Sequence, residues 1–388
     1  MTNNSPENFA STATTSIVAR ADLHAALDMA KLVVEARNTV PILDCAQLTG
    51  STAGLTVTAT DLDTSISVVV PGAADVGSIT FLPVRKVHGI LGKNKDLETV
   101  AIDTIGATDS TDEMVKLDLE AVDFTLNSGG FEVADFPVLT GTRDNHIATI
   151  PTEELARIFG KISHAISQEE TRYYLNGIYM HVFDGHLCYV ATDGRRLVRY
   201  EGNTNVNEGS VFGGMIIPKK AIAVMMKIMK RKDCPASVKV EVGGESSIAF
   251  TLGHIRLETK VIDGTFPDYH RIMPQPNGEH KIACNSALFA KVLDRVTSIT
   301  AKGAAIKLTL GGDRVTCTTQ TEGNSASAEF VAETTDDEFE FGMNSHYLAE
   351  ALKIMGETTK IETHNAGDPM LITGDDDNMK MVLMPIRT

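Results

Sequence analysis

Two aspartates in the segment Ala59-Thr60-Asp61-Leu62-Asp63 are the paired carboxylates with the clearest chemical potential in this sequence. Such a pair can bind a metal ion or supply a general base. Aspartates at this spacing at the end of an expected strand are also typical of a turn. We therefore expect a turn at Asp61 and Asp63. A metal-dependent hydrolase or transferase that uses them is kept as an alternative hypothesis.

Other motifs with a known chemical mechanism are missing from the sequence. It contains no GxxxxGK[ST] phosphate loop, no HExxH, no GxSxG and no GxGxxG. Asp375, Asp376 and Asp377 look like a solvated hairpin tip, and the eleven histidines are scattered, so we expect surface positions for most of them. We expect no catalytic residues, no cofactor and no metal site, and hence a protein that is not an enzyme.

Length and composition suggest several domains in a globular chain. The 388 residues are too many for one ordinary core, and 43% are hydrophobic and 22% charged. Thirty-five Lys and Arg against 51 Asp and Glu give a net charge of −16, which excludes an overall attraction to nucleic acid or anionic membranes but leaves room for a local basic patch. Residues 1–16 are polar and are expected to form a disordered tail. Five widely spaced cysteines without a CxxC pair favour a reducing cytoplasm and no disulfides.

One helical pattern occurs six times along the chain. Apolar residues at i, i+3, i+4 and i+7 are typical of a helix with one buried face, and copies start at residues 23, 84, 155, 222, 289 and 348. We expect Asp22, Thr152 and Ser286 to accept hydrogen bonds at helix starts. Short alternating runs between the helices, such as 55–60, 65–70, 115–119, 238–242, 306–310 and 379–384, predict antiparallel strands. The sequence thus predicts an α+β protein with three similar domains, 17–144, 145–270 and 271–388, each with two helices packed on antiparallel sheet.

Positive charge is concentrated on the expected helices. The segments 22–38, 83–95, 152–168, 218–232, 286–302 and 345–357 together hold 18 basic and 8 acidic residues, although the chain as a whole is strongly acidic. If several helices face one concavity, their basic faces would attract a phosphate backbone without reading its sequence. The alternative is that Lys and Arg are simply favourable on helix surfaces.

Two segments and the C-terminus have unusual surface chemistry. Arg172-Tyr-Tyr-Leu-Asn-Gly177 has adjacent tyrosines, Ala191-Thr-Asp-Gly-Arg-Arg-Leu197 has clustered arginines, and the chain ends in Val382-Leu-Met-Pro-Ile-Arg387. Tyrosine and arginine dominate many binding surfaces, and methionine adapts to peptide ligands. The alternative is a buried edge strand with core tyrosines.

These segments, together with Thr265-Phe-Pro-Asp-Tyr269, closely resemble the β sliding clamps, the processivity subunits of bacterial DNA polymerase III. The resemblance covers nearly the whole chain from about residue 17. It implies a DNA-clamp fold in which two chains join head to tail into a ring, with helices lining the hole. It further implies a cytoplasmic homodimer that encircles duplex DNA and tethers the replicative polymerase and other partners.

The resemblance also implies the site residues. A groove for short motifs of the polymerase III catalytic subunit, the clamp loader and other proteins would be an apolar trough with an arginine rim. It would comprise Arg172, Tyr174, Leu175, Thr192, Gly194, Arg195, Arg196, Leu197, Pro267, Ile272, Pro369, Val382, Met384, Pro385, Ile386 and Arg387. DNA contacts would involve Arg37, Arg85, Lys86, Gln168, Tyr173, Lys219 and Lys220. The dimer interface would place Phe124 and Leu126 against Ile299 of the other chain.

The chain departs from this family at several places. The polar tail before Ser16 and the segment Gly106 to Glu113 are longer than the family usually needs, Ala121 and Asp123 replace basic residues beside the first-domain edge strand, and Arg195 stands where some members have His. We therefore compare three hypotheses: a non-catalytic DNA clamp, the hydrolase or transferase above, and a repeat-built protein scaffold that does not bind nucleic acid. The basic helices disfavour the scaffold.

Overall fold

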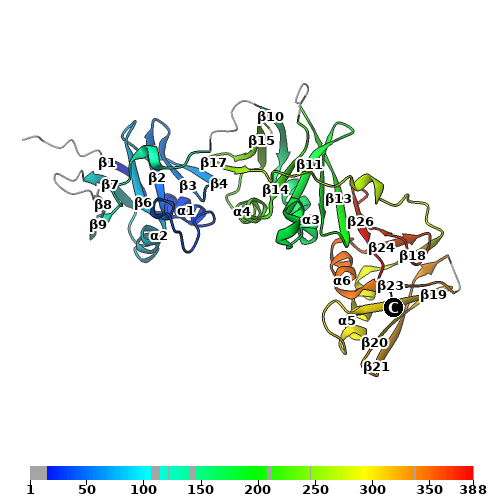
Figure 1. The fold of residues 1–388 in the computed structure, drawn as a ribbon. Coiled ribbons are helices and arrows are strands. Elements are labelled where there is room, and N and C mark those ends of the chain that lie inside the picture. The colour runs from blue at the N-terminus through cyan, green and yellow to red at the C-terminus, as the bar shows by residue number, and fades with distance from the viewer. Residues whose placement is uncertain are drawn as a thin grey trace, which may run out of the picture. The chain divides into compact units, whose positions relative to one another are not determined.

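The computed structural model describes residues 15–105, 114–120, 122–139, 145–207, 212–244, 246–335 and 338–387 (Figure 1). The segment Gly106 to Glu113 and Ala121 lie outside these residues, as do residues 1–14. Thr15 and Ser16, which the sequence placed in the tail, belong to strand β1 and pair with Asp103 and Ile102. The chain divides into two compact units, Met1–Thr149 with Lys227–Lys260, and Ile150–Met226 with Val261–Thr388.

Two antiparallel sheets belong mainly to the first unit. The five-stranded sheet has the order β5-β1-β7-β8-β9, and the eight-stranded sheet has the order β10-β15-β16-β17-β4-β3-β2-β6. Their strands are β1 (Thr15–Ala19), β2 (Cys45–Ser51), β3 (Gly54–Thr60), β4 (Thr64–Val70), β5 (Gly72–Ala73), β6 (Ile79–Pro83), β7 (Thr99–Ile105), β8 (Met114–Leu119), β9 (Val122–Asn127), β10 (His146–Pro151), β15 (Ser237–Gly243), β16 (Ser247–Leu252) and β17 (Ile255–Lys260).

Two further antiparallel sheets belong to the second unit. Their orders are β14-β11-β12-β13-β26-β25-β24-β18-β22 and β21-β20-β19-β23. The strands are β11 (Gly177–Phe183), β12 (His186–Thr192), β13 (Arg196–Asn205), β14 (Met215–Pro218), β18 (His280–Asn285), β19 (Ala305–Gly311), β20 (Arg314–Thr321), β21 (Asn324–Val331), β22 (Glu333–Thr334), β23 (Glu340–Asn344), β24 (Thr358–Thr363), β25 (Met370–Thr373) and β26 (Met379–Leu383). Each strand predicted from alternation is present.

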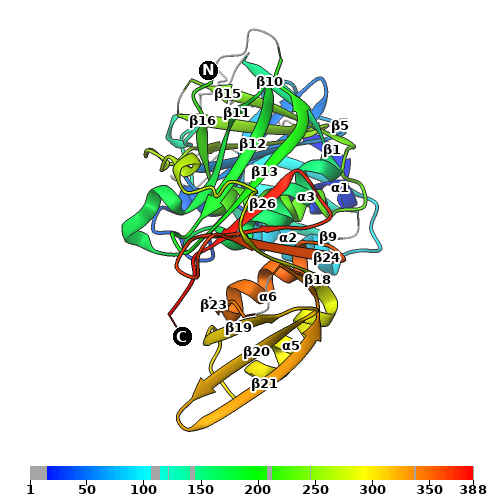
Figure 2. The ribbon, with the colours of Figure 1, turned by 90° about the vertical axis from the view of Figure 1, so that its right-hand side faces the viewer.

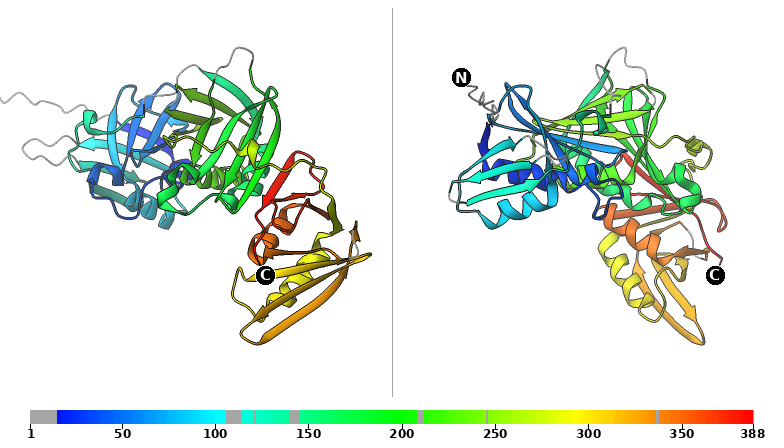
Figure 3. Two further views of the ribbon diagram at one scale, coloured as in Figure 1. Left: turned by 45° about the vertical axis from the view of Figure 1, so that its right-hand side comes forward. Right: turned by 60° about the vertical axis from the view of Figure 1, so that its left-hand side comes forward.

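All six predicted helices are present. They are α1 (Arg20–Ala30), α2 (Val84–Lys93), α3 (Thr152–Ile162), α4 (Lys219–Met229), α5 (Ser286–Thr297) and α6 (Ser345–Ile354). The apolar stripe that predicted each helix is its packed face. In α3, for example, Leu155, Ile158, Phe159 and Ile162 are all fully buried. Figure 3 shows α5 and α6 on one side of the β21-β20-β19-β23 sheet, where α5 contacts β20 and β21.

The predicted helix caps were wrong. Helix α1 begins at Arg20 and α3 at Thr152, so Asp22 and Thr152 lie within the first turns rather than ahead of them. Asn285 caps α5 by accepting from the amide of Leu288, while the Ser286 hydroxyl shares a hydrogen bond with Thr359. Among the α-helices whose cap residues the structure describes, two are capped by a side chain. Both caps are asparagines that end a strand, Asn285 and Asn344.

Two strand pairs join segments that are far apart in the sequence. Strand β17 pairs with β4 in the first unit, with Leu257 opposite Ile66. Strand β13 pairs with β26 in the second unit, with Leu197 opposite Val382, and Figure 2 shows these two strands side by side. The second pairing places the C-terminal strand directly against the segment that contains the clustered arginines. No helix of the described residues is long and apolar enough to cross a membrane.

Candidate functional site

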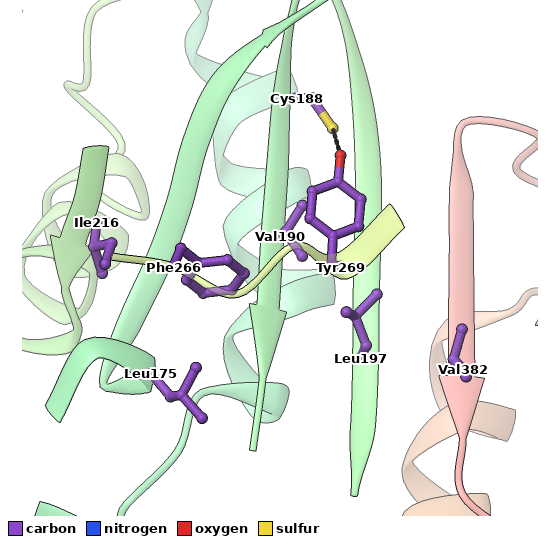
Figure 4. Packing of buried hydrophobic residues seen from close by; sticks show 8 residues of the cluster. All are labelled: Leu175, Cys188, Val190, Leu197, Ile216, Phe266, Tyr269 and Val382. Carbon is purple, nitrogen blue, oxygen red and sulfur yellow. Dashed lines mark hydrogen bonds between the residues drawn. The ribbon is translucent and has the colours of Figure 1, made fainter. Parts of the chain in front are cut away.

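An apolar cluster beneath the β13–β26 pair gathers several of the predicted groove residues (Figure 4). We call it the Tyr269 cluster; it consists of Leu175, Cys188, Val190, Leu197, Ile216, Phe266, Tyr269 and Val382. Every member is less than a tenth exposed, and Tyr174 packs against them half-buried. The predicted Leu175, Leu197 and Val382 therefore meet in one core, although they come from three separate segments. Their contribution is mainly structural, because buried side chains offer little surface to a ligand.

The turn between β12 and β13 is shaped by its own side chains. The Thr192 hydroxyl donates to the carbonyl of Arg196 at 2.6 Å and accepts from the amide of Gly194 at 3.1 Å. Asp193 Oδ1 accepts from the amides of Arg195 and Arg196 at 2.9 and 3.0 Å. Gly194 has φ +84, and a Cβ there would lie 2.8 Å from Arg172 Nη1. The turn therefore requires glycine at this position and brings Arg172 close to it.

Arg196, which the sequence placed in the arginine rim of the groove, is only 8% exposed. Its Nε donates to Asp193 Oδ2 at 3.0 Å, its Nη1 bonds Glu350 on α6, and its Nη2 bonds the carbonyl of His164. The guanidinium also lies 4.4 Å from the ring centre of Tyr347. Burial raises the pKa of Glu350, but the hydrogen bond and charge of Arg196 outweigh burial and hold that pKa below its ordinary value. Arg196 thus joins β13 to α6.

The remaining predicted arginines are exposed, and exposed apolar side chains lie in the neighbouring segments. Arg172, Arg195 and Arg387 are all exposed, and Arg172 Nε lies 3.3 Å from Glu169 Oε2. Ile272 is 46% exposed and Met384 is 41% exposed, which is high for apolar residues of this size.

The C-terminal segment is held by backbone hydrogen bonds. The Met384 amide donates to Arg195 O at 2.9 Å, and the Ile386 amide donates to Gly342 O at 3.0 Å. Pro267 is exposed, while Pro369, Pro385 and Ile386 are half-buried.

The predicted DNA-binding residues fall on both units. In the first unit Arg37, Arg85 and Lys86 are exposed, and Arg85 Nη2 donates to Val34 O at 3.0 Å. In the second unit Lys219 Nζ donates to Gln168 Oε1 at 3.0 Å, Tyr173 is 53% exposed and Lys220 is half-buried. Arg85 and Lys86 lie in the first turn of α2, and Lys219 and Lys220 lie in the first turn of α4. Arg37, Gln168 and Tyr173 lie in the segments that follow α1 and α3, and none of the seven residues lies on a strand.

The predicted dimer residues lie at two edges. Phe124 and Leu126 are half-buried on β9, the last strand of the five-stranded sheet, and Asp123 Oδ2 lies 3.4 Å from Lys116 Nζ. Ile299 follows α5 and is 42% exposed. Strand β21 is the last strand of the four-stranded sheet, and its outward residues are mostly exposed. A strand at the end of a sheet has unpaired backbone groups that another strand can complete.

The acidic clusters have structural partners. Asp61 Oδ1 accepts from the amides of Asp63 and Thr64 at 3.0 and 2.6 Å, so it shapes the β3–β4 turn as predicted, and Asp63 Oδ1 lies 3.1 Å from Lys260 Nζ. The described residues contain no group of three or more His, Cys, Asp or Glu that could hold a metal ion.

The expectation of a fully solvated tip at 375–377 was wrong for Asp376. Its Oδ2 accepts from Lys161 Nζ at 2.8 Å and from the Tyr200 hydroxyl at 2.9 Å. Burial, and to a smaller extent the hydrogen bond to Asp376, raises the pKa of Tyr200 to about 12. The tip of the β25–β26 turn is therefore fixed to α3 and β13.

Sequence reasoning missed two residues that shape the site. Tyr269 and Cys188 lie at the centre of the Tyr269 cluster, with the Cys188 sulfur 3.9 Å from the Tyr269 hydroxyl (Figure 4). Burial raises the pKa of both side chains, so both are neutral. The motif Thr265-Phe-Pro-Asp-Tyr269 was the signal that could have identified Tyr269, whereas nothing in the sequence around Cys188 marks it. All five cysteines are free thiols.

Family models match this chain along nearly its whole length. The N-terminal, central and C-terminal domain models of the DNA polymerase III beta subunit match residues 14–140, 149–268 and 270–387. Among curated proteins, a beta sliding clamp of Caulobacter vibrioides is 34% identical over 382 residues, which is 95% of this chain and 99% of that protein. A beta sliding clamp of Pseudomonas aeruginosa is 27% identical and covers 92% of this chain and 95% of its own length.

Solved structures give the same result. A crystal structure of the C. crescentus beta sliding clamp with polyethylene glycol bound to a putative beta-motif tethering region has a TM-score of 0.86 at 33% identity, covering 97% of this chain and 99% of that one. A sliding clamp from Bartonella birtlesii bound to griselimycin has a TM-score of 0.84 at 28% identity, covering 97% and 100%.

The three-domain arrangement of paired helices on antiparallel sheets is therefore a DNA-clamp fold, as predicted. The chain belongs to the DNA polymerase III beta subunit family, and its function is that of a sliding clamp, a non-catalytic subunit.

Proposed function

We propose that two copies of this chain close head to tail into a ring around duplex DNA and tether the polymerase III catalytic subunit, the clamp loader and other partners through a short peptide motif. The main support for tethering is that four segments far apart in the sequence meet at the Tyr269 cluster. These are residues 172–175, the turn 192–197, the linker 266–272 and the C-terminal strand. Exposed Ile272 and Met384 give this region apolar surface. An aliphatic and aromatic peptide end suits such a surface.

The ring proposal is supported by two strands that end their sheets. β9 carries Phe124 and Leu126, and the C-terminal unit offers β21 together with Ile299 beside α5. Head-to-tail contact between two different edges closes into a ring when the rotation between copies is half a turn. The proposed domain bounds are 17–144, 145–270 and 271–388. A role in replication places this function in the cytoplasm.

DNA would be held by helix surfaces through sequence-independent contacts. α4 carries Lys219, Lys220 and Lys227 and no acidic residue, and the charged residues of α2 are likewise all basic. Such contacts weaken steeply with salt. Tethering raises the effective concentration of a polymerase at its primer end, which is how a clamp that makes no chemical bond increases processivity.

The test of tethering is a chain that lacks residues 384–388. Binding of a fluorescent synthetic peptide ending in Leu-Phe would be measured by anisotropy, with the same peptide ending in Ala-Ala as the control. We expect affinity for Leu-Phe to be abolished in the truncated chain while light scattering still gives a dimer near twice 41.7 kDa. Retained micromolar affinity would contradict the groove, and a monomeric full-length chain would contradict the ring.

A charge-reversal variant tests the DNA surface. Lys219→Glu with Lys220→Glu should reduce retention on circular DNA at least tenfold while leaving peptide affinity unchanged. The matched control reverses two strand lysines, half-buried Lys307, which pairs with Glu340, and exposed Lys360, as Lys307→Glu with Lys360→Glu. If both double variants lost DNA retention equally, the effect would come from overall charge. If the Lys219 and Lys220 variant lost peptide affinity as much as DNA retention, the loss would indicate misfolding.

A further inference from the structure

The linker between β17 and β18 carries two proposed groove residues, Pro267 and Ile272, and is fastened at three points. The Ile262 amide donates to Ile216 O at 2.9 Å. The Phe266 ring stacks on Tyr179, with centres 4.7 Å apart and an interplanar angle of 8°. The Tyr269 hydroxyl lies 2.9 Å from Nε2 of His181 on β11. Figure 4 shows Tyr269 and Phe266 lying over strands of the sheet that contains β12 and β13.

The direction of the bond between His181 and Tyr269 follows from the other ring nitrogen. His181 Nδ1 lies 3.0 Å from the carbonyl oxygen of Val182, which can only accept, so Nδ1 carries the hydrogen. In a neutral imidazole Nε2 is then an acceptor. Tyr269 therefore donates its hydroxyl hydrogen to His181, and the bond in this form requires an uncharged ring.

The surroundings of His181 disfavour a second proton. Burial lowers the pKa of His181, and the charges of His270 and Arg199 lower it further, although the bond to Val182 acts in the opposite direction. Arg199 comes from β13, where its Nη1 lies 2.9 Å from Glu201 Oε1, and His270 comes from the linker itself. Cys188 on β12 faces the other side of the Tyr269 hydroxyl, and Tyr179 stacks on the imidazole from the same strand.

Protonation would reverse the hydrogen bond. Nε2 would become a donor, so the Tyr269 hydroxyl would have to rotate and accept, with its hydrogen left facing the Cys188 sulfur at 3.9 Å. Sulfur is a weak acceptor. The new cation would also lie among Arg199 and His270. The docked linker is therefore favoured while His181 is neutral, and it is weakened once the ring is charged.

We propose that His181 is a positioning residue for the peptide groove: its neutral ring accepts the Tyr269 hydroxyl hydrogen, holds the linker with Pro267 and Ile272 in place, and makes peptide binding fall at acidic pH. This rests on the proposed groove. Because the neutral form is the one that holds the linker, affinity should be complete above the ordinary histidine pKa of about 6.5 and decline below it. One neutral hydrogen bond corresponds to roughly a 3- to 10-fold change in affinity.

The test is a pH series of peptide binding on the full chain between pH 7.5 and 5.5, with the Leu-Phe peptide as the probe. The native protein should lose affinity 3- to 10-fold. His181→Gln should retain affinity at pH 7.5, since an amide oxygen can accept from Tyr269, and should lose the pH dependence. Tyr269→Phe should be weak and independent of pH. His254→Gln, at an exposed position between β16 and β17 of the first unit, is the matched control and should keep the native profile.

A second readout does not depend on the peptide. The amides of Ile272 and Met273 both donate to Tyr269 O, at 3.1 and 3.2 Å, so their hydrogen exchange reports whether the linker turn that Tyr269 begins stays ordered. After correction for intrinsic exchange rates, the protection of these two amides should decrease as the pH is lowered in the native chain. It should stay constant in His181→Gln. A native-like pH profile in His181→Gln, by either readout, overturns the role of His181. Absent peptide binding at every pH, with linker protection still controlled by His181, would overturn the groove instead.

Discussion

The two faces of strand β13 contact different parts of the molecule. Side chains alternate along a strand, so Arg196, Val198 and Tyr200 share one face, and Leu197, Arg199 and Glu201 share the other. The first face is held by charge: Arg196 bonds Glu350, and Tyr200 shares Asp376 with Lys161. On the second face Leu197 packs in the Tyr269 cluster, where neutral Tyr269 and Cys188 meet.

This difference shows how one strand can be tied to its neighbours by charged and polar contacts on one face while its other face contributes to an apolar core beside the proposed groove. The ion pair of Arg196 with Glu350 ties β13 to α6, and the hydrogen bond from Tyr200 to Asp376 ties it to the β25–β26 turn. On the second face Leu197 is buried in the Tyr269 cluster, and Arg199 and Glu201 beside it form an ion pair of 2.9 Å. Neighbouring arginines in the sequence, Arg195 and Arg196, thus have different roles: the first is exposed, and the second is buried in the contact with α6.

The largest expected effect comes from removing the charge on the first face. Arg196→Met leaves Glu350 partly buried without its partner, and breaking a buried pair costs about 3–5 kcal/mol, reduced here because Glu350 retains some exposure. We expect a free energy of unfolding lower by on the order of 3 kcal/mol, measured by urea denaturation. The matched control is Arg195→Met, which should change it by about 0.5 kcal/mol or less. Equal effects would mean that the contact between β13 and α6 does not depend on Arg196.

A smaller effect is expected at the second anchor of the same face. Asp376→Asn weakens the bonds from Lys161 and Tyr200 and should lower the free energy of unfolding by about 1–2 kcal/mol, with exposed Asp377→Asn as the control.

The stabilisation that Asp376 provides should be lost at acid pH. Burial raises the pKa of Asp376, but the bonds from Lys161 and Tyr200 outweigh it and the net direction is down. The stabilisation is therefore present above the ordinary aspartate pKa of about 3.9 and is lost as pH falls below it. Denaturation of native and Asp376→Asn chains should converge at low pH, and a constant difference would contradict the assignment.

The smallest expected effect is the response to salt. Raising sodium chloride from 50 to 500 mM should weaken the Lys161–Asp376 pair by less than about 1 kcal/mol and leave the Tyr269 cluster unchanged. Hydrogen exchange of the Asn378 and Met379 amides, which bond Asp376, should quicken, while that of Ile272 and Met273 should not. A uniform response would show that both faces are stabilised in the same way.

The sequence predicted local periodicity and the family but not the partners of individual polar groups. Six helices and the strands followed from apolar spacing, because burial of one face imposes that spacing. The predicted caps were wrong because Asn285, not Ser286, caps α5, and because Asp22 and Thr152 lie within the first turns of α1 and α3. The buried state of Arg196 could not be predicted, since its partners Glu350 and His164 lie 154 and 32 residues away. Tyr269 lay within a recognised motif, whereas its partner His181 had no local signal.

The pairing of β4 with β17 has a consequence for synthesis of the chain. Thr64 and Thr259 face each other in that pair although they are 195 residues apart. At translation rates of roughly 5–20 residues per second, β4 leaves the ribosome about 10–40 s before its partner exists. During that interval β4, which is rich in valine, pairs with β3 on one edge and has its other edge unpaired, a surface of the kind that chaperones protect. Premature termination anywhere in the middle domain would make that exposure permanent, so incomplete chains should aggregate rather than accumulate as folded fragments.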